Sequence, residues 1–271
     1  MRYQLPIVIA VAAVCAACGG GDGGFTPDPV PQPDTIRTVT GTIGHHSTGP
    51  RLSNLDSNGR LIAEPGLIES TLPAGAPRVP VEVLDLNGAV MGTTLTDTRG
   101  SYSVDVNFGQ AAATQVVVRI QAVLNLPFGT RVRVLPNASA TEPYIHQTPP
   151  SGNPDDRTMR VDLSIDLDEG AAAYRMLNVL YPGFVEAAQG ILVGDIPDVD
   201  LYWEPGNGPT SSFDGSRSDL GRITVAGGIT GDPTSNTDCW DESVVARLLG
   251  EYLLHYFFLV SAPDGDGNDA R

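Results

Sequence analysis

The side chains of this sequence that could do chemistry together lie near its carboxyl end. Glu251 and His255 are four residues apart, a spacing that places both on one face of a helix. A carboxylate and an imidazole one helical turn apart can reach the same metal ion, and Asp241 or Asp238 could add an acidic third ligand. A zinc ion held in this way would activate water for the hydrolysis of a peptide bond.

The helix that must position these groups is predicted over residues 240–259. Its large apolar side chains recur at three- and four-residue spacing, which is typical of a helix with one face in a core. They are Val244, Val245, Leu248, Leu249, Tyr252, Leu253, Tyr256 and Phe257. Leu248 lies in the middle of this apolar stripe, so we expect the helix to have a packing role.

The segment that leads to this helix mixes helix and strand. Apolar residues at helical spacing predict a helix from residue 169 to the pair Pro182 and Gly183, where we expect a break and then a short helix over 184–189. Apolar runs predict strands at 199–203 and 222–226. Residues 168–260 are therefore predicted to be a smaller α/β segment.

Residues 35–167 show the alternation of strands with one apolar face. Val81 and Val83, Val118 and Ile120, and Val132 and Val134 each share a parity. Turn signals separate these strands, and the Gly-, Ser-, Asn- and Pro-rich stretch 44–77 reads as a long loop. Several half-buried strands of this kind predict an antiparallel β-sandwich.

Three short stretches of this region resemble a known family. They are Val39-Thr40-Gly41-Thr42-Ile43, Val81-Glu82-Val83, and Thr96-Asp97-Thr98-Arg99-Gly100-Ser101-Tyr102. They are similar to the carboxypeptidase regulatory-like domain, a transthyretin-like β-sandwich. The resemblance implies a spacer or adhesion module without catalytic residues. In its turn, we expect Asp97 to cap the backbone, Gly100 to adopt unusual angles, and Tyr102 to return to the core.

The last helix and its approach resemble bacterial secreted zincin-like metallopeptidases, which carry D-x-Y-D-x-S-V-x-x-H-E-x-G-H-Y at this point. The positions that agree are Asp238, Asp241, Ser243, Val244, Gly250 and Tyr252. The resemblance places Arg247 at the first zinc-ligand position, Leu248 at the general-base position and Glu251 at the second ligand position. Arginine has no lone pair to offer a metal, and leucine cannot transfer a proton. The resemblance therefore implies a degenerate, truncated segment without a metal site or catalytic residues.

The amino-terminal residues predict export. Arg2, a short apolar run and the small residues before Cys18 form the pattern of a secretory signal. A Gly-rich stretch follows, and this combination resembles a bacterial lipoprotein with Cys18 as the lipidated first residue of the mature chain. An ordinary cleaved signal with an incidental cysteine is the alternative. In either case Cys239 is expected to be a buried, unpaired thiol.

We therefore divide the chain into five predicted parts. They are a lipoprotein signal peptide (1–18), a Gly/Pro-rich tether (19–34), the regulatory-like sandwich (35–167), the degenerate zincin-like segment (168–260) and a disordered tail (261–271). The predicted fold class is thus mixed, with a β-sandwich domain followed by a smaller α/β segment.

Charge and motifs together define the predicted function. The 32 acidic and 16 basic residues give a formal charge of −16, which disfavours binding to nucleic acid. We predict a non-catalytic lipoprotein of the bacterial cell envelope, at the outer membrane or secreted, with a binding or structural role. Its predicted partners are the membrane, through the lipid anchor, and an envelope protein or glycan. Two alternatives stay open: a divergent secreted metallopeptidase that uses zinc, and a decaying gene fragment.

Overall fold

The structure is a computed structural model of the whole chain. It describes residues 35–55, 61–69, 72–109, 114–126, 129–190, 197–208, 210–217, 219–227 and 238–261. For residues 49–55, 61–69, 187–190 and 257–261 only the backbone is described. The described residues form a mixed, β-rich fold with two α-helices, which confirms the predicted class at this coarse level.

The first sheet is built around β1 (Ile36–His45), whose residues Val39 and Ile43 are fully buried. β1 is antiparallel to β7 (Ser101–Asn107) and β4 (Ala74–Gly75). It is parallel to β12 (Thr158–Arg160) and β13 (Leu163–Ile165). The sheet is therefore mixed, whereas the sequence predicted antiparallel pairing throughout. Alternation reveals which face of a strand is buried, but it does not reveal the direction of the neighbouring strand.

The second sheet is antiparallel and has four strands. Its order is β11 (Ile145–Gln147), β8 (Val117–Gln121), β5 (Pro80–Leu84) and β6 (Val90–Leu95). Val81, Val83, Val118 and Ile120 are fully buried, so the apolar face predicted for these strands is confirmed.

The turn between β6 and β7 has the predicted chemistry. Asp97 Oδ1 accepts hydrogen bonds from the backbone N–H groups of Arg99 and Ser101, both at 2.8 Å. Gly100 has a φ of 81°, in the left-handed region that favours glycine. Tyr102 is buried and donates its hydroxyl to the carbonyl of Val161 at 2.6 Å. Tyr102 thereby connects β7 to the residues between β12 and β13.

The third sheet contains strands from both sides of residue 168. Its order is β15 (Ser212–Asp214), β16 (Leu220–Thr224), β14 (Asp198–Tyr202), β10 (Arg131–Leu135) and β9 (Val123–Asn125). β10, β14 and β16 are parallel, and the two outer strands are antiparallel to their neighbours. The predicted strands at 199–203 and 222–226 are thus present. Because β9 and β10 precede residue 168, this sheet spans the predicted domain boundary.

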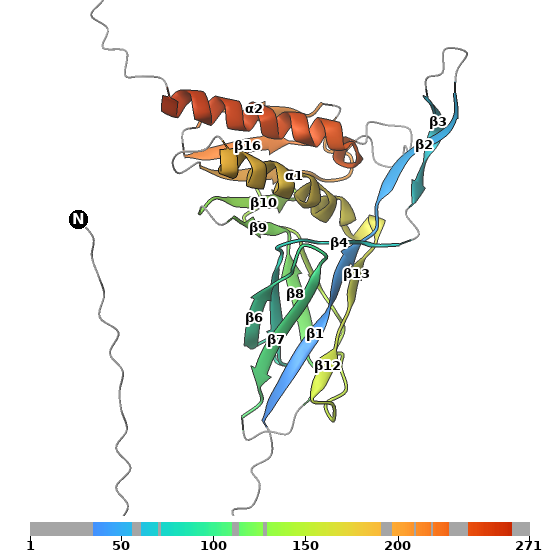
Figure 1. Cartoon of the computed structure of the whole chain (residues 1–271), viewed down its shortest axis with the longest axis vertical. Coiled ribbons are helices and arrows are strands. Elements are labelled where there is room, and N and C mark those ends of the chain that lie inside the picture. Colours follow the sequence, from blue (N-terminus) through green and yellow to red (C-terminus); the bar gives the residue numbers. More distant parts are fainter. Residues whose placement is uncertain are drawn as a thin grey trace, which may run out of the picture. The chain divides into compact units, whose positions relative to one another are not determined.

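The two helices lie side by side against the third sheet (Figure 1). α1 (Ala171–Gly190) follows the 3-10 turn η1 (Leu167–Glu169), and α2 (Glu242–Ser261) follows η2 (Asp238–Trp240). The helix predicted at the carboxyl end is confirmed.

The break predicted at Pro182 is wrong, because α1 continues through this proline. Leu180 and Phe184, on either side of it, are buried, and their packing offsets the hydrogen bond that proline removes.

A hairpin occupies most of the stretch predicted as a long loop. β2 (Thr48–Leu55) and β3 (Leu61–Glu69) pair antiparallel with two shifts of register. Turn-forming residues within the strands suggested a loop, but an irregular pairing with bulges accommodates them.

One apolar core connects all three sheets and both helices. Buried residues from β1, β5, β8, β10, β14, α1 and α2 belong to the same cluster. No helix in the part of the chain that the structure describes is both long and apolar enough to cross a bilayer.

Candidate functional site

α2 begins with a cap that uses one of the predicted acidic ligands. Asp241 Oδ1 accepts hydrogen bonds from the backbone N–H of Ser243 at 2.9 Å and from its hydroxyl at 2.7 Å. These bonds hold the pKa of Asp241 below its usual value. A serine or carboxylate at this position stabilises the first turn of a helix. Asp241 therefore has a structural task at the start of α2.

Most of the apolar stripe predicted for α2 packs into the core, and the side chain of Phe257 lies outside the described residues. Val245, Leu248, Leu249, Tyr252 and Tyr256 are each at most 5% exposed, and Leu248 is fully buried. The close approach of α2 to β16 requires a glycine in the strand, since a Cβ at Gly221 would lie 2.4 Å from the ring of Tyr252. The general-base position of the resembled peptidases thus holds a core side chain.

The two ligand positions of the resembled motif face solvent and contact each other. The guanidinium of Arg247 donates a hydrogen bond to Glu251 Oε1, one helical turn away. Their side chains are 52% and 43% exposed. A carboxylate paired with arginine on a helix surface contributes to helix stability but presents no second metal-binding group.

His255 is held among aromatic rings. Its ring lies 5.5 Å from that of Phe213 and 4.9 Å from that of Tyr256, and it lies directly over Gly215. Asp238 accepts a hydrogen bond from the hydroxyl of Ser211. The residues of the alternative zinc site are therefore engaged separately. Within the described ranges, no group of three or more His, Cys, Asp and Glu side chains could hold a metal ion.

A cluster of rings that the sequence did not predict lies where β14 ends and α1 begins. Tyr144 donates its hydroxyl to the carbonyl of Trp203 at 2.8 Å, and the two rings are 5.7 Å apart. The rings of His146 and Tyr174 are 5.5 Å apart and nearly perpendicular. Gly170 has a φ of 96°, and a Cβ added there would lie 3.0 Å from the ring of Tyr144. The cluster lies at the carboxyl end of β14. This is the edge at which α/β sheets commonly bind ligands.

Burial favours the neutral forms of His146 and of Cys239, a thiol that interacts with Trp203 of this cluster. It raises the pKa of the Cys239 thiol to about 12 and lowers the pKa of His146. The thiol therefore stays protonated at neutral pH and is a poor nucleophile. Cys239 is buried and unpaired, which confirms its predicted role. The sequence could not reveal the cluster, because Tyr144 and Trp203 are 59 residues apart.

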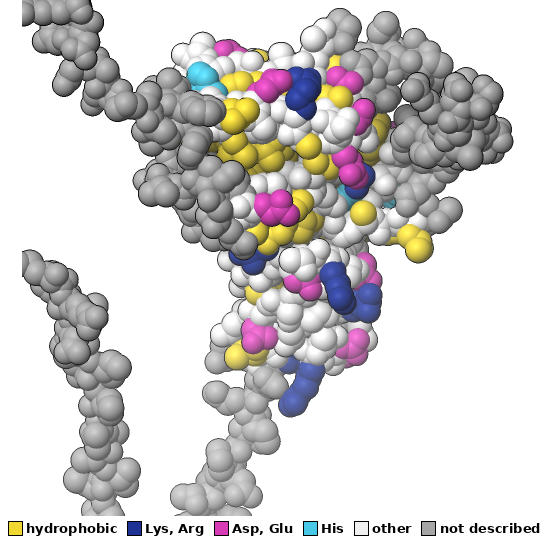
Figure 2. All heavy atoms as spheres, turned by 45° about the horizontal axis from the view of Figure 1, so that its top comes forward, with side chains coloured by type: hydrophobic (Ala, Val, Ile, Leu, Met, Phe, Trp, Pro, Cys, Tyr) yellow, Lys and Arg dark blue, Asp and Glu magenta, His cyan; other side chains and the backbone are white. Residues whose placement is uncertain are grey.

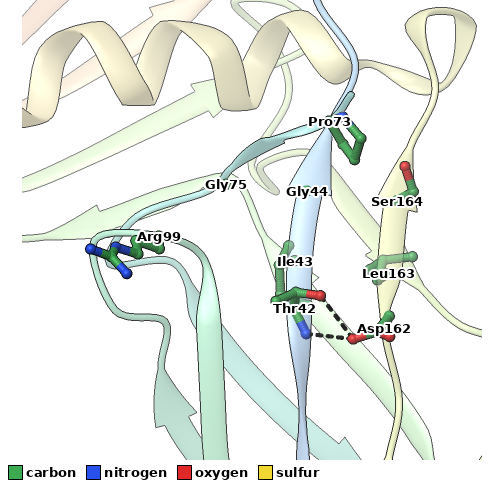
Figure 3. A pocket seen from close by; sticks show the side chains of 9 residues that line it. All are labelled: Thr42, Ile43, Gly44, Pro73, Gly75, Arg99, Asp162, Leu163 and Ser164. Atoms are coloured by element: carbon green, nitrogen blue, oxygen red, sulfur yellow. Dashed lines mark hydrogen bonds between the residues drawn. The ribbon is translucent and has the colours of Figure 1, made fainter. Parts of the chain in front are cut away.

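A separate pocket opens beside β1, β4 and β13 (Figure 3). Its volume is about 390 Å³, and Gly44, Pro73, Gly75, Asp162 and Ser164 contribute to its lining. The carboxylate of Asp162 accepts hydrogen bonds at 2.8 Å from the backbone N–H and the hydroxyl of Thr42. Arg160 donates a third at 2.9 Å. Burial acts to raise the pKa of Asp162, but these bonds together outweigh it and lower the pKa. The pocket therefore presents a fixed, ionised carboxylate.

Charges of both signs lie on the face of the described residues that Figure 2 shows. On the face in Figure 2, arginines are interspersed with Asp and Glu side chains.

Two of the predicted features lie outside the described residues. They are the lipidation site Cys18, with the signal peptide and tether, and residues 262–271 of the predicted tail. Ser261, the first residue of that predicted tail, is the last residue of α2.

Comparisons with known proteins leave the family of this chain open. No protein-family model matches the sequence, and no curated protein matches it. Among solved structures, the fold is similar to the crystal structure of a 9R-lipoxygenase from Cyanothece PCC8801, with 10% sequence identity and a TM-score of 0.27. That match covers 64% of this chain and 27% of the lipoxygenase chain, so this chain spans about a quarter of that protein. A likeness of this size carries no argument about activity.

Proposed function

We propose that this protein is a non-catalytic lipoprotein of the bacterial cell envelope with a structural or binding role. The observation that carries the proposal is the fate of the resembled zinc motif on α2. Leu248 is a core residue, while Arg247 and Glu251 satisfy each other at the surface. The three positions that peptidase chemistry needs thus serve folding and solubility.

The resemblances to two families are part of this proposal. Asp97, Gly100 and Tyr102 act in their turn as a regulatory-like, transthyretin-like sandwich would require. On α2, a Cβ at Gly250 would meet nothing within 4 Å, so packing does not require glycine there. Descent from a zincin-like helix, in which this position is glycine, accounts for its presence.

The binding role would use the pocket at Asp162. Fixed carboxylates accept hydrogen bonds from sugar hydroxyls or from the backbone of an extended peptide. An envelope glycan or protein segment fits this chemistry better than an anion, which the carboxylate would repel. Asp162→Asn, which keeps the shape of the side chain, should weaken such binding. Asp219→Asn, at another exposed aspartate paired with an arginine, is the matched control.

Peptidase activity is tested on casein with added zinc and, separately, with a chelator. We expect no difference between the two incubations and none between the wild-type chain and His255→Ala. Zinc-dependent cleavage that His255→Ala abolishes would support the divergent peptidase instead.

The lipid anchor is tested by the mass of the mature amino terminus. We expect a chain that begins at Cys18 and carries a diacylglyceryl group, and we expect Cys18→Ser to remain unlipidated. A mature chain that begins elsewhere, without lipid, would contradict the anchor.

A further inference from the structure

Exposed apolar side chains gather at the end of the fold where the chain enters it. Six large apolar residues are exposed in the described part of the chain: Ile36, Leu72, Leu86, Val90, Ile145 and Leu254. Ile36, Leu86 and Val90 are each about half exposed, at 51%, 53% and 51%. The strand registers show that these three share one end of the first two sheets.

The pairing of β1 with β7 and the contact of β6 with β7 show that Ile36 and Val90 lie at the same end of the sheets. Ile36 pairs with Asn107 at the end of β7. β6 lies against β7, because a Cβ at Gly92 would approach Val104 and Val106 within 3.5 Å. Val90, two residues before Gly92, therefore lies level with the last residues of β7. Leu86 belongs to the turn that joins β5 to β6, next to Val90.

The entering chain is held at the same end. The carbonyl of Thr35 accepts a hydrogen bond from the backbone N–H of Phe108 at 2.9 Å. Seventeen peptide steps separate Cys18 from Thr35. Whatever conformation residues 19–34 take, such a chain reaches at most about 60 Å. The chain joins Cys18 to the fold at this end, so a lipid on Cys18 would lie within about 60 Å of Thr35.

Two acidic groups of this end accept hydrogen bonds from the protein. Asp85 Oδ1 accepts hydrogen bonds from the N–H groups of Asn87 and Ala89, at 2.9 and 2.8 Å. Asp105 accepts one from the hydroxyl of Thr38 at 2.8 Å. These bonds partly compensate the charges of Asp85 and Asp105. Asp155, Asp156 and Arg157 are exposed at the same end, because the carbonyl of Arg157 accepts a hydrogen bond from the backbone N–H of Thr38. Ile36, Leu86 and Val90 therefore project from this end together with charged side chains.

We propose that the surface formed by Ile36, Leu86 and Val90 rests on the phospholipid bilayer to which the chain is anchored. The proposal rests on the lipid anchor of the proposed function. Anchoring raises the effective concentration of this surface at the bilayer to the order of millimolar, so that a few apolar side chains suffice for contact. The helices and the third sheet then face away from the membrane, since β1 spans about 30 Å from Ile36 to His45 beside α1.

The test places a fluorophore at each end of the anchored chain. Ala89→Cys lies between Leu86 and Val90, and Ala246→Cys lies on the exposed side of α2 as a matched control. Cys239 is buried and resists labelling. The lipidated protein is incorporated into phosphatidylcholine vesicles that contain a lipid with a spin-labelled headgroup. We expect the label at position 89 to lose about half of its fluorescence and the label at 246 to lose little.

A second variant separates contact from mere proximity. In the Ala89→Cys chain, Leu86→Asp together with Val90→Asp should abolish most of the quenching while the protein still sediments with the vesicles. Equal quenching at 89 and 246, or unchanged quenching in the double-aspartate chain, would overturn the contact and leave the anchor intact. A chain that carries no lipid on Cys18 and does not sediment would overturn the anchor, and the contact with it.

Discussion

Arg247 and Glu251 form an exposed ion pair across one turn of α2, beside the buried Leu248. In the peptidases that this segment resembles, the two equivalent positions would point together at a zinc ion. Here the pairing satisfies both charges at the surface. The place of α2 in the fold rests on the apolar side chains that it buries.

Truncating Leu248 should be costly, whereas truncating Arg247 should not. Leu248→Ala leaves a cavity in the core and should lower the free energy of unfolding by about 2–5 kcal/mol. Arg247→Ala removes an exposed ion pair and should lower it by less than about 1 kcal/mol. Urea unfolding followed by circular dichroism measures both. Equal effects for the two variants would show that Leu248 is not a core residue.

Gly250 in α2 and Gly221 in β16 should respond in opposite directions to alanine. Gly250→Ala should stabilise α2 by about 0.5–1 kcal/mol, because glycine is a poor helix former and the added methyl meets nothing within 4 Å. Gly221→Ala should destabilise, because the new methyl would press on the ring of Tyr252. Thermal unfolding compares the two. A destabilising Gly250→Ala would reveal a contact that this packing lacks.

The ion pair between Arg133 and Asp200 should matter more than the surface pairs. Two hydrogen bonds of 2.7 Å join these residues across β10 and β14, and the Asp200 side chain is 4% exposed. Asp200→Ala leaves a half-buried guanidinium unpaired and should cost about 3–5 kcal/mol. Asp219→Ala, which breaks the exposed pair with Arg217, should cost less than about 1 kcal/mol. The midpoints of urea unfolding provide the comparison, provided that the dependence of unfolding free energy on urea concentration is the same in both variants. A small effect of Asp200→Ala would argue against the pairing of β10 with β14.

His45 should make stability fall in mild acid. Burial lowers the pKa of His45 to about 4, and its Nε2 must accept the hydrogen bond from Asn178 Nδ2 at 2.7 Å, which requires a neutral ring. The unfolded chain therefore binds the extra proton between the ordinary value of 6.5 and about 4. Stability is fully present above this window and is lost as the pH falls through it, by on the order of 3 kcal/mol.

The variant His45→Gln isolates this contribution. It should flatten the dependence of unfolding free energy on pH between 6.5 and about 4. Some slope should remain, because burial also lowers the pKa of His146. Carboxylates such as Asp162, whose pKa is lowered, act at more acidic pH and are unaffected by the substitution. An unchanged slope would show that His45 is protonated without penalty.

Local patterns predicted the parts of the fold that depend on neighbouring residues. Alternation located the apolar faces of β5 and β8, and helical spacing located α2 and the burial of Leu248. The turn at Asp97 followed from side-chain chemistry alone. Each of these features is set by residues within a few positions of one another.

The features that failed or were missed depend on distant contacts. Parallel pairing of β1 with β12 and β13, and the sheet shared by β10 and β14, join residues far apart in the sequence. Continuation of α1 through Pro182 follows from core packing that no local rule contains. The ring cluster at Tyr144 also joins residues far apart in the sequence.

The sheet that spans residue 168 also bears on the alternative of a decaying gene fragment. A segment that begins after residue 168 would lack β9 and β10, so its failure to fold alone would not show that the gene is decaying.

The zinc content of the purified, full-length chain tests the central claim most directly. After dialysis against buffer with added zinc and then against buffer without it, elemental analysis should find well below one zinc per chain, and the same in Glu251→Gln. About one tightly held zinc per chain, removed by a chelator together with proteolytic activity, would contradict the account.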